Sequence, residues 1–280
     1  MSHLAHIKQK IKTVETIAKV THAMRLSAMS THNQLKQDFL NVTEYANNLF
    51  RLFNQMRHDN PSWSHPLLTK QNNNSKLLII IGSQKGLCGS FTNIVAHKAM
   101  TTYTSIQYQS IIIVGKHINT FLSAHYGIVP ALSFNQFNSD NYTTIAQSII
   151  DYIWNHEQKF TQITIICMKS KGFFVQIPII HEFLEQIIIS KKIDQLHEYC
   201  YEKDISLTLE PLFNQASVAL LMSYLHDSLI AEQAARFLSM DNSTRNAKKI
   251  LETTKLYYCK LRQTKITTQL MELISVSENH

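Results

Sequence analysis

The sequence predicts an α/β protein with long helices, in which the N- and C-terminal helices form an antiparallel coiled coil and an α/β domain is inserted between them. All five prolines and all six glycines of the 280-residue chain lie between residues 61 and 211. Because glycine and proline are the strongest breakers of regular structure, the two ends are expected to form uninterrupted helices. In the middle, short β-branched runs alternate with helical segments, which indicates the inserted domain.

The N-terminal helix is expected to span residues 1–58. From Leu4 to Ala28, the residues at alternating steps of three and four are apolar or small except for Arg25, and an apolar stripe continues from Leu35 to Met56. This spacing is typical of the seam of a coiled coil. Small and polar residues dilute the seam, which suggests that the helix pair is itself surrounded by another protein.

The C-terminal helix is expected to span residues 212–280, with the same alternation of steps from Ala247 to Thr268. A helix rises about 1.5 Å per residue, so each end could form a rod of roughly 90–100 Å. Such a rod must bury its stripe against something. The simplest partner is the other end of the chain, in an antiparallel pair closed by the middle region.

The middle of the chain predicts a Rossmann-like α/β domain over residues 76–210. Three short aliphatic runs suit buried strands, namely residues 76–81, 110–115 and 163–168. Two helical candidates lie between them, at residues 92–105 and 141–157. Strand and helix therefore alternate, which favours a largely parallel sheet. Residues 204–211 are expected to add one more strand before the last helix.

The excess of positive charge lies on the two terminal helices. Residues 1–58 hold eight Lys/Arg against three Asp/Glu, and residues 212–280 hold eight against six, whereas the middle holds eleven of each. A basic rod is expected to bind an acidic partner, which could be nucleic acid, lipid headgroups or acidic protein loops. A solvated helix face is the simpler interpretation of the same charges.

The composition argues against several classes of protein. The longest aliphatic runs are too short to span a bilayer, and the N-terminus lacks the apolar core of a signal peptide. The four cysteines are widely separated with no Cys-x-x-Cys pair, and the fourteen histidines are scattered, which argues against a zinc site or a disulfide framework. We therefore expect a cytoplasmic chain without a metal or a cofactor.

One stretch looks like a phosphate-binding loop. Residues 77–95 read LLIIIGSQKGLCGSFTNIV, in which three glycines follow an apolar run. A P-loop requires a lysine after its last glycine, whereas Lys85 precedes Gly86, and the glycine spacing of dinucleotide-binding loops is absent as well. The glycines are better explained as a tight turn between a strand and a helix. With no other catalytic motif, the chain is predicted to be a scaffold or a moving part rather than an enzyme.

Three segments, in this order along the chain, resemble signatures of the gamma-subunit family of F-type ATP synthase. Residues 7–30 resemble its lysine-rich N-terminal helix, and residues 86–93, GLCGSFTN, resemble its Gly-Leu-Cys-Gly signature. Residues 231–275 are similar to its C-terminal signature, with matches at Glu232, Ala235, Arg236, Met240, Asn246, Ala247, Arg262, Gln263, Ile266, Thr267, Leu270 and Glu272. One departure is Gln84, because the family often has an acidic-basic pair where this chain has Gln84 and Lys85.

This resemblance implies a mechanical role without a catalytic group. In the family, the paired helices form the central rotor shaft inside the alpha3 beta3 hexamer, and the α/β domain forms a foot on the epsilon subunit and the c-ring of the membrane sector. Torque passes between the ion-driven ring and the catalytic beta subunits. The resemblance implies no cofactor, no nucleic acid and no transmembrane segment, and a peripheral location on the cytoplasmic face of the bacterial inner membrane.

The resemblance also implies which residues serve these contacts. The residues matched to contacts between the shaft and the beta subunit are Met24, Arg25, Arg236, Arg262, Gln263 and Thr267. The residues of the foot-domain signature are Gly86, Leu87, Cys88, Gly89 and Asn93. Without the resemblance, Met24 would be interpreted as a methionine of the seam and Arg262 as a solvated charge.

Two alternative functions remain open at this point. A basic coiled-coil protein could bind nucleic acid through its helical arms, with an affinity that falls as salt rises. An α/β enzyme with a helical clamp could bind a nucleotide, with an affinity that is lost on changing Gly86 or Gly89. Neither alternative explains the C-terminal segment 231–275.

Overall fold

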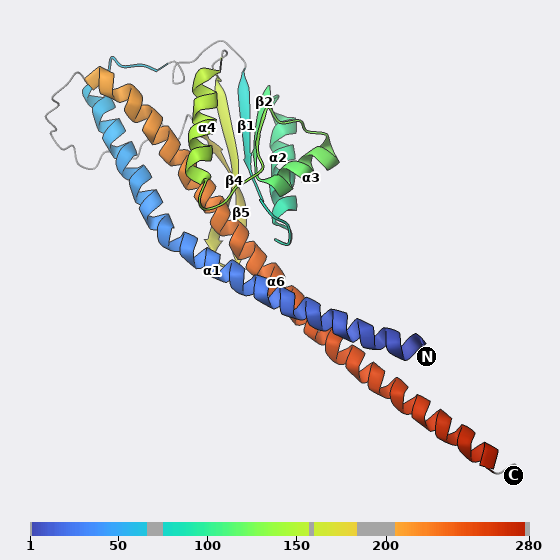
Figure 1. Cartoon of the computed structure of the whole chain (residues 1–280). Coiled ribbons are helices and arrows are strands. Elements are labelled where there is room, and N and C mark those ends of the chain that lie inside the picture. The colour runs from blue at the N-terminus through green and yellow to red at the C-terminus, as the bar shows by residue number, and fades with distance from the viewer. Residues whose placement is uncertain (1, 66–74, 157–159, 184–204, 278–280) are drawn as a thin grey trace. The chain divides into compact units, whose positions relative to one another are not determined.

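The structure, a computed structural model, divides into two compact units (Figure 1). Unit 1 consists of residues 1–28 and 237–280, and unit 2 consists of residues 29–236. The parts of the chain that the structure describes are residues 2–65, 75–156, 160–183 and 205–277. Two long helices, α1 (Ser2–Asp59) and α6 (Ile205–Ser277), each contribute to both units.

A five-stranded sheet is the centre of unit 2, with the strand order β3-β2-β1-β4-β5. Its strands are β1 (Lys76–Ile81), β2 (Ser110–Val114), β3 (Leu132–Phe134), β4 (Gln162–Gly172) and β5 (Val175–Glu182). Strands β1 to β4 run parallel to one another, and β5 pairs antiparallel with β4 at the edge. The predicted largely parallel sheet is confirmed.

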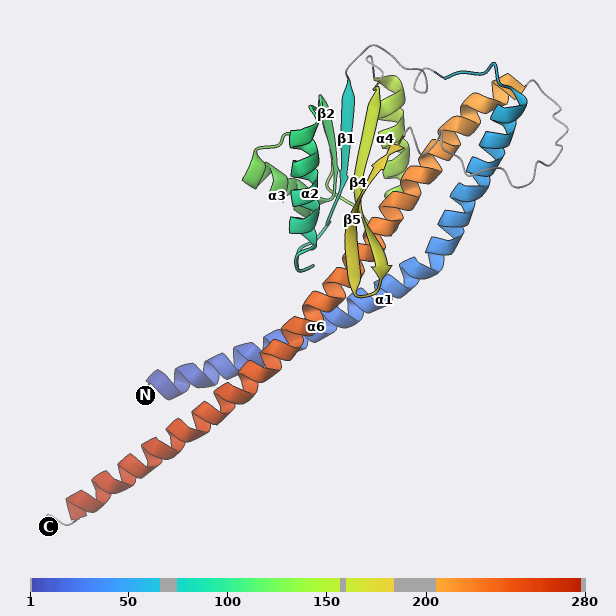
Figure 2. The ribbon, with the colours of Figure 1, turned by 180° about the vertical axis from the view of Figure 1, so that it is seen from behind.

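Helices cover both faces of this sheet, as Figure 2 shows. Helices α2 (Phe91–Ser105) and α3 (Lys116–Tyr126) pack on one face, and α4 (Tyr142–Asn155) packs on the other together with parts of α1 and α6. The side chains of β1 alternate between the two cores. Leu77, Ile79 and Ile81 contribute to the α4 side, whereas Leu78 and Ile80 contribute to the α2 side.

An aromatic cluster joins α1, α4 and α6 within unit 2. The Phe213 ring of α6 lies 5.5 Å from the ring of Phe53 in α1 and 5.5 Å from that of Trp154 in α4, measured between ring centroids. Trp63 and His65, which follow α1, complete the cluster, at 6.0 and 4.6 Å from Phe213. Phe53 and Phe213 are fully buried, so the cluster is part of the main core of unit 2.

The structure corrects one predicted element and adds others. Residues 204–211 were expected to form a strand, but α6 begins at Ile205 and continues through Pro211. Apolar and polar residues alternate in this stretch as they do in a strand, but the buried side chains Leu209 and Phe213 are four residues apart, as in a helix. Strands β3 and β5 and helix α3 were not predicted. The predicted domain limits 1–58, 76–210 and 212–280 stay a prediction, because residues 184–204 lie outside the described residues.

Candidate functional site

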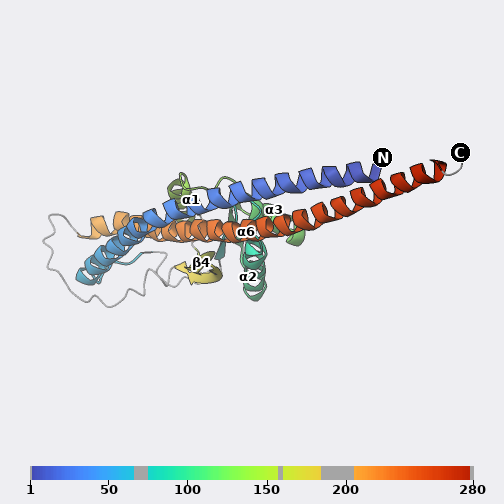
Figure 3. The same ribbon diagram turned by 90° about the horizontal axis from the view of Figure 1, so that it is seen from below.

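In unit 1 the two ends of the chain form an antiparallel helix pair, which Figure 3 shows side by side. The contacts run in opposite directions along the two helices: Thr21 meets Thr244 at 2.9 Å between their hydroxyl oxygens, and Glu15 meets Lys255 at 2.7 Å. Seam positions of α1 such as Ile7 are buried or half-buried, and most of the residues between them are exposed. The predicted antiparallel coiled coil is confirmed here.

Arg25 is engaged inside this helix pair. Its Nη1 donates to Asp241 Oδ1 at 2.7 Å, and Arg245 contacts the other oxygen of the same carboxylate at 2.6 Å. The hydrogen bond from Arg25 is the main reason why the pKa of Asp241 lies below its usual range. Met24, beside Arg25, is half-buried in the seam. The contact of Met24 and Arg25 with a partner subunit stays a prediction.

Helix α6 is exposed at every described side chain from Arg262 to Ile274. Among these side chains are three of the predicted contact residues, Arg262, Gln263 and Thr267. The same segment exposes large apolar side chains at helical spacing, with exposed fractions of 48% at Ile266 and 55% at Leu270. The apolar tip, as we call it, consists of Ile266, Leu270, Met271, Leu273 and Ile274.

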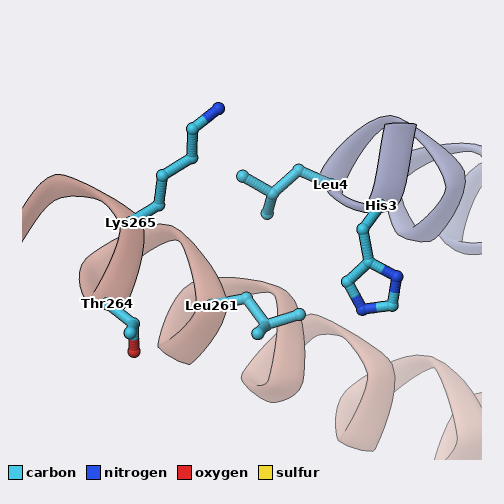
Figure 4. Close-up of a pocket in the computed structure, with 5 residues that line it drawn as sticks. All are labelled: His3, Leu4, Leu261, Thr264 and Lys265. Carbon is cyan, nitrogen blue, oxygen red and sulfur yellow. The ribbon is translucent and has the colours of Figure 1, made fainter. Parts of the chain in front are cut away.

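A groove lies just before this tip, where α6 meets the first residues of α1. Its lining residues, shown in Figure 4, are His3 and Leu4 from α1 and Leu261, Thr264 and Lys265 from α6. The volume of the groove is about 310 Å³. Leu261 is the last half-buried side chain of α6, and all described side chains after it are exposed. The groove therefore marks the end of the paired region.

Threonine hydroxyls of α6 bond back to their own helix. Thr264, Thr267 and Thr268 each donate to the carbonyl oxygen four residues earlier, at 3.0–3.1 Å. Thr253 and Thr254 do the same closer to the middle of the unit 1 segment. The hydroxyl proton of Thr267 is therefore already in use, which leaves its methyl group and an oxygen lone pair for a partner.

The Gly-Leu-Cys-Gly signature lies in unit 2, in the loop between β1 and α2. Leu87 is the only described non-glycine residue with a positive φ, 63°, and its side chain is 59% exposed. Cys88 is buried, with its sulfur 3.6 Å from Thr92 Oγ1. Gly86 is half-buried, while Gly89, with φ 61°, and Asn93 are exposed. The loop therefore makes the tight turn that its glycines predict.

Arg236 lies against this loop and not on a free surface of unit 2. It is 7% exposed, donates to Gln233 Oε1 at 2.8 Å, and pairs with the buried carboxylate of Glu232. Its Nη2 also donates to the carbonyl oxygen of Lys85 at 3.4 Å. The structure thus places Arg236 beside the Gly-Leu-Cys-Gly loop in unit 2. The other predicted contact residues of α6, Arg262, Gln263 and Thr267, belong to unit 1.

Asp227 of α6 is a half-buried acid beside the sheet of unit 2. Its nearest cation is Lys169 of β4, with Nζ 4.0 Å from Oδ2. Burial raises the pKa of Asp227 to about 6, and Lys169 offsets only part of this effect. The pKa in the folded state therefore lies above the unfolded-state pKa of about 3.9, so the folded state binds this proton more tightly. The contribution of the bound proton to the free energy of unfolding is lost as the pH rises through about 6.

Replacing Asp227 by asparagine is therefore expected to stabilise unit 2 at neutral pH. The gain in the free energy of unfolding should be larger at about pH 7.5 than at about pH 4.5, by roughly 1–2 kcal/mol, because only ionised Asp227 carries the burial penalty. Urea unfolding of the full chain at the two pH values measures this difference. Glu252→Gln, an exposed acid of α6, is the control. An equal gain at both pH values would contradict the assignment.

The described residues hold no group of three or more His, Cys, Asp or Glu side chains placed to bind a metal ion. None of the helices in the described ranges combines the length and the apolar composition needed to cross a membrane.

Sequence reasoning missed three features of these sites. The partner of Arg25, Asp241, was not identified, because a pair 216 residues apart leaves no local pattern. The position of Glu232 under the loop was missed for the same reason. The apolar tip could have been found, since Ile266, Leu270 and Leu273 keep a helical spacing beyond the end of the seam.

Comparisons with known proteins identify relatives over the whole chain. The profile of the family described as "ATP synthase" matches residues 3–278. The ATP synthase gamma chain of Mycoplasmopsis agalactiae is 29% identical over 291 residues, which cover 98% of each chain. The ATP synthase gamma chain of Geotalea uraniireducens is 25% identical, over 100% of this chain and 99% of the relative.

Solved structures share the fold. A chain of the Euglena gracilis mitochondrial ATP synthase, in a structure of OSCP, F1 and c-ring, aligns with a TM-score of 0.65 at 14% identity and covers 98% of this chain and 93% of that chain. A chain of the Tetrahymena thermophila central stalk and c-ring aligns with a TM-score of 0.58 at 19% identity, over 80% of this chain and 98% of that chain.

Proposed function

The chain belongs to the ATP synthase family, as a gamma chain and central rotor stalk of the F-type enzyme, and we propose that it transmits torque through the apolar tip and the exposed polar residues beside it. It is a non-catalytic subunit, so ATP chemistry takes place elsewhere in the complex. This membership replaces the two alternatives of a nucleic-acid-binding coiled coil and a nucleotide-binding enzyme.

The observation that carries the proposal is the exposure of apolar side chains at the end of α6. Five large apolar side chains on a single helix end are each about half to two-thirds exposed. Fully burying one such side chain is worth about 1.5–3 kcal/mol, so a helix end of this kind is favoured inside an enclosing partner. An alpha3 beta3 hexamer offers a central passage for it, with acidic beta loops for the cations beside the tip.

Arg262, Gln263 and Thr267 are placed to supply the polar part of this contact. All three are exposed on α6 within one and a half turns, next to Ile266 of the tip. The Arg262 guanidinium presents five donors and keeps its charge, which suits a carboxylate on the beta subunit. A charged hydrogen bond of this kind gives each angle of the rotor a defined contact with the facing subunit.

Replacing Arg262 by alanine is expected to weaken ATP-driven proton pumping in the assembled complex, by about threefold or more, because one charge-assisted contact worth about 1–3 kcal/mol is lost. Pumping into inverted membrane vesicles measures the effect. The isolated chain should keep its circular dichroism spectrum, because Arg262 is exposed. Lys249→Ala, another exposed cation of α6 in the paired region, is the control. Normal pumping with normal assembly would remove Arg262 from the contact.

The foot and the location of the complex are part of the same proposal. The α/β domain of unit 2 is proposed to contact the epsilon subunit and the c-ring, and the chain is proposed to lie at the cytoplasmic face of the bacterial inner membrane. The bacterial origin of the curated gamma chains similar to it supports this location. Co-purification of alpha, beta and epsilon subunits with the tagged full chain, from membranes, tests both statements.

A further inference from the structure

Glu232 of α6 points its carboxylate at the backbone of the loop between β1 and α2. One carboxylate oxygen accepts the N–H of Gln84 at 3.0 Å, and the other accepts the N–H of Lys85 at 3.3 Å. The residue is 2% exposed. Arg236, one turn further along α6, pairs with the same carboxylate and so balances its charge. A buried carboxylate is costly unless it is paired and hydrogen-bonded, and Glu232 is both.

The position of this carboxylate in the fold is specific. The chain leaves β1 for β2 and β3 on one side, and then returns to β4 on the other side of β1. The carboxyl ends of β1 and β4 therefore form the point at which the strand order reverses. In open parallel sheets this crevice is where ligands bind, and successive backbone N–H groups of the first loop there bind anions such as phosphate.

The neighbouring loops converge on the same place. The Gln84 side chain accepts the N–H of Lys116 at the start of α3, at 3.1 Å, and donates to the carbonyl oxygen of Asn135 after β3, at 2.9 Å. The carbonyl oxygen of Ser83 accepts the N–H of His117 at 3.1 Å. The loops after β1, β2 and β3 are thus tied together around the segment whose N–H groups face Glu232.

We propose that Glu232 is an internal ligand: its carboxylate occupies the anion-binding position of the α/β domain and thereby fastens α6 to the first loop of the sheet. A side chain of the chain itself stands where a phosphate would bind in a nucleotide-binding fold. The loop keeps its N–H groups directed at an anion, and the anion belongs to α6. Arg236 is a positioning residue that holds the carboxylate and the Lys85 carbonyl oxygen together.

The latch, meaning Glu232 with the N–H groups of Gln84 and Lys85, has a mechanical consequence that rests on the proposed function. Ala231 and Ala235, on either side of Glu232, pack in the core shared with α2 and α3. Small side chains let the helix approach closely, and the carboxylate then fixes its rotation relative to the loop. Torque that enters the α/β domain passes to α6 through this directed contact as well as through the apolar core.

Amide hydrogen exchange of the full chain tests the latch directly. In Glu232→Ala, exchange in a peptide covering residues 82–87 should be at least tenfold faster than in the wild type, because two N–H groups lose their acceptor. In Glu232→Gln the amide can accept only one of the two bonds, so an intermediate increase is expected. Glu252→Ala, an exposed acid of the same helix, should leave exchange unchanged. Unchanged exchange in both Glu232 variants would overturn the proposal.

Addition of sodium acetate separates an anion-binding position from a general structural role. At an acetate concentration of about 0.2 M, exchange in Glu232→Ala should return to within about threefold of the wild type, while sodium chloride at equal ionic strength should not restore it. Acetate fits because it supplies the carboxylate that the variant lacks. An identical effect of the two salts would overturn the internal-ligand assignment. If Glu232→Ala does not fold, the amide exchange of Glu232→Gln tests the proposal: an intermediate increase supports it, and unchanged exchange contradicts it.

Assembled complexes carrying Glu232→Ala test the link to torque. ATP-driven proton pumping should fall by about threefold or more relative to ATP hydrolysis, and acetate should restore it in part. Faster amide exchange together with full pumping would support the latch as a structural contact but contradict its role in transmitting torque. A chain that assembles with no alpha and beta subunits, whatever residue stands at position 232, would instead contradict the proposed function.

Discussion

Replacing Phe213 by alanine is expected to lower the free energy of unfolding of unit 2 by about 3–5 kcal/mol, the usual cost of removing a buried phenyl ring. Phe213 is 1% exposed and touches rings from α1, from α4 and from the segment after α1. The cavity cannot be filled by a simple shift, because three separate segments would have to move together. Most of the cost therefore remains in the folded state.

Intrinsic fluorescence is a specific probe for this prediction. The chain has two tryptophans, Trp63 and Trp154, and both belong to the aromatic cluster around Phe213. Urea unfolding followed by their emission reports on this region of unit 2. Phe174→Ala, in the turn between β4 and β5 where the ring is 73% exposed, is the control and should change stability by less than about 0.5 kcal/mol. A loss below about 1 kcal/mol for Phe213→Ala would contradict the prediction.

Introducing aspartates at Ile266 and Leu270 together is expected to reduce the alpha and beta subunits that co-purify with the chain by at least threefold. These two side chains belong to the apolar tip, which the proposed function places inside the partner hexamer. Burying each carboxylate there would cost several kcal/mol, in addition to the apolar contact that is lost. Quantitative gels of complexes isolated at native expression levels measure the ratio of subunits.

The matched control adds the same charge without removing apolar surface. Thr264→Asp combined with Thr268→Asp places two aspartates four residues apart on the same exposed segment, as in the test variant. Circular dichroism of the isolated chains should be similar, since both pairs are exposed. A control that loses its partners as strongly as the test variant would show that charge alone, and not the apolar tip, determines assembly.

Much of the architecture follows from patterns that are local in sequence. Strand β1 lies at the predicted residues 76–81, and α1 runs without a break from Ser2 to Asp59. These elements were predictable because the position of glycine and proline, the helical stripe and the aliphatic runs are each visible within a short window. The short strand β3 escaped prediction because its three residues carry no run of apolar side chains.

The candidate sites were less accessible to sequence reasoning. The loop that resembled a phosphate-binding loop is a tight turn, but only the structure reveals that Glu232, 148 residues beyond Gln84, meets its N–H groups. A contact of this separation depends on the completed fold and leaves no periodic signal. The resemblance to a known family supplied residues such as Arg262 that no spacing rule would have selected, and their contacts with beta stay predictions.

The threonines of α6 have a consequence for friction inside the complex. Hydroxyl groups that already donate to the carbonyl oxygens of their own helix, as those of Thr264 and Thr268 do, offer no free proton to a surrounding wall. Dispersion contacts of methyl groups are weak and lack direction, whereas each hydrogen bond to the wall would have to break at every step. If the segment turns inside the hexamer, as the proposed function has it, these threonines add little directional resistance, and a directed contact is left to side chains such as Arg262.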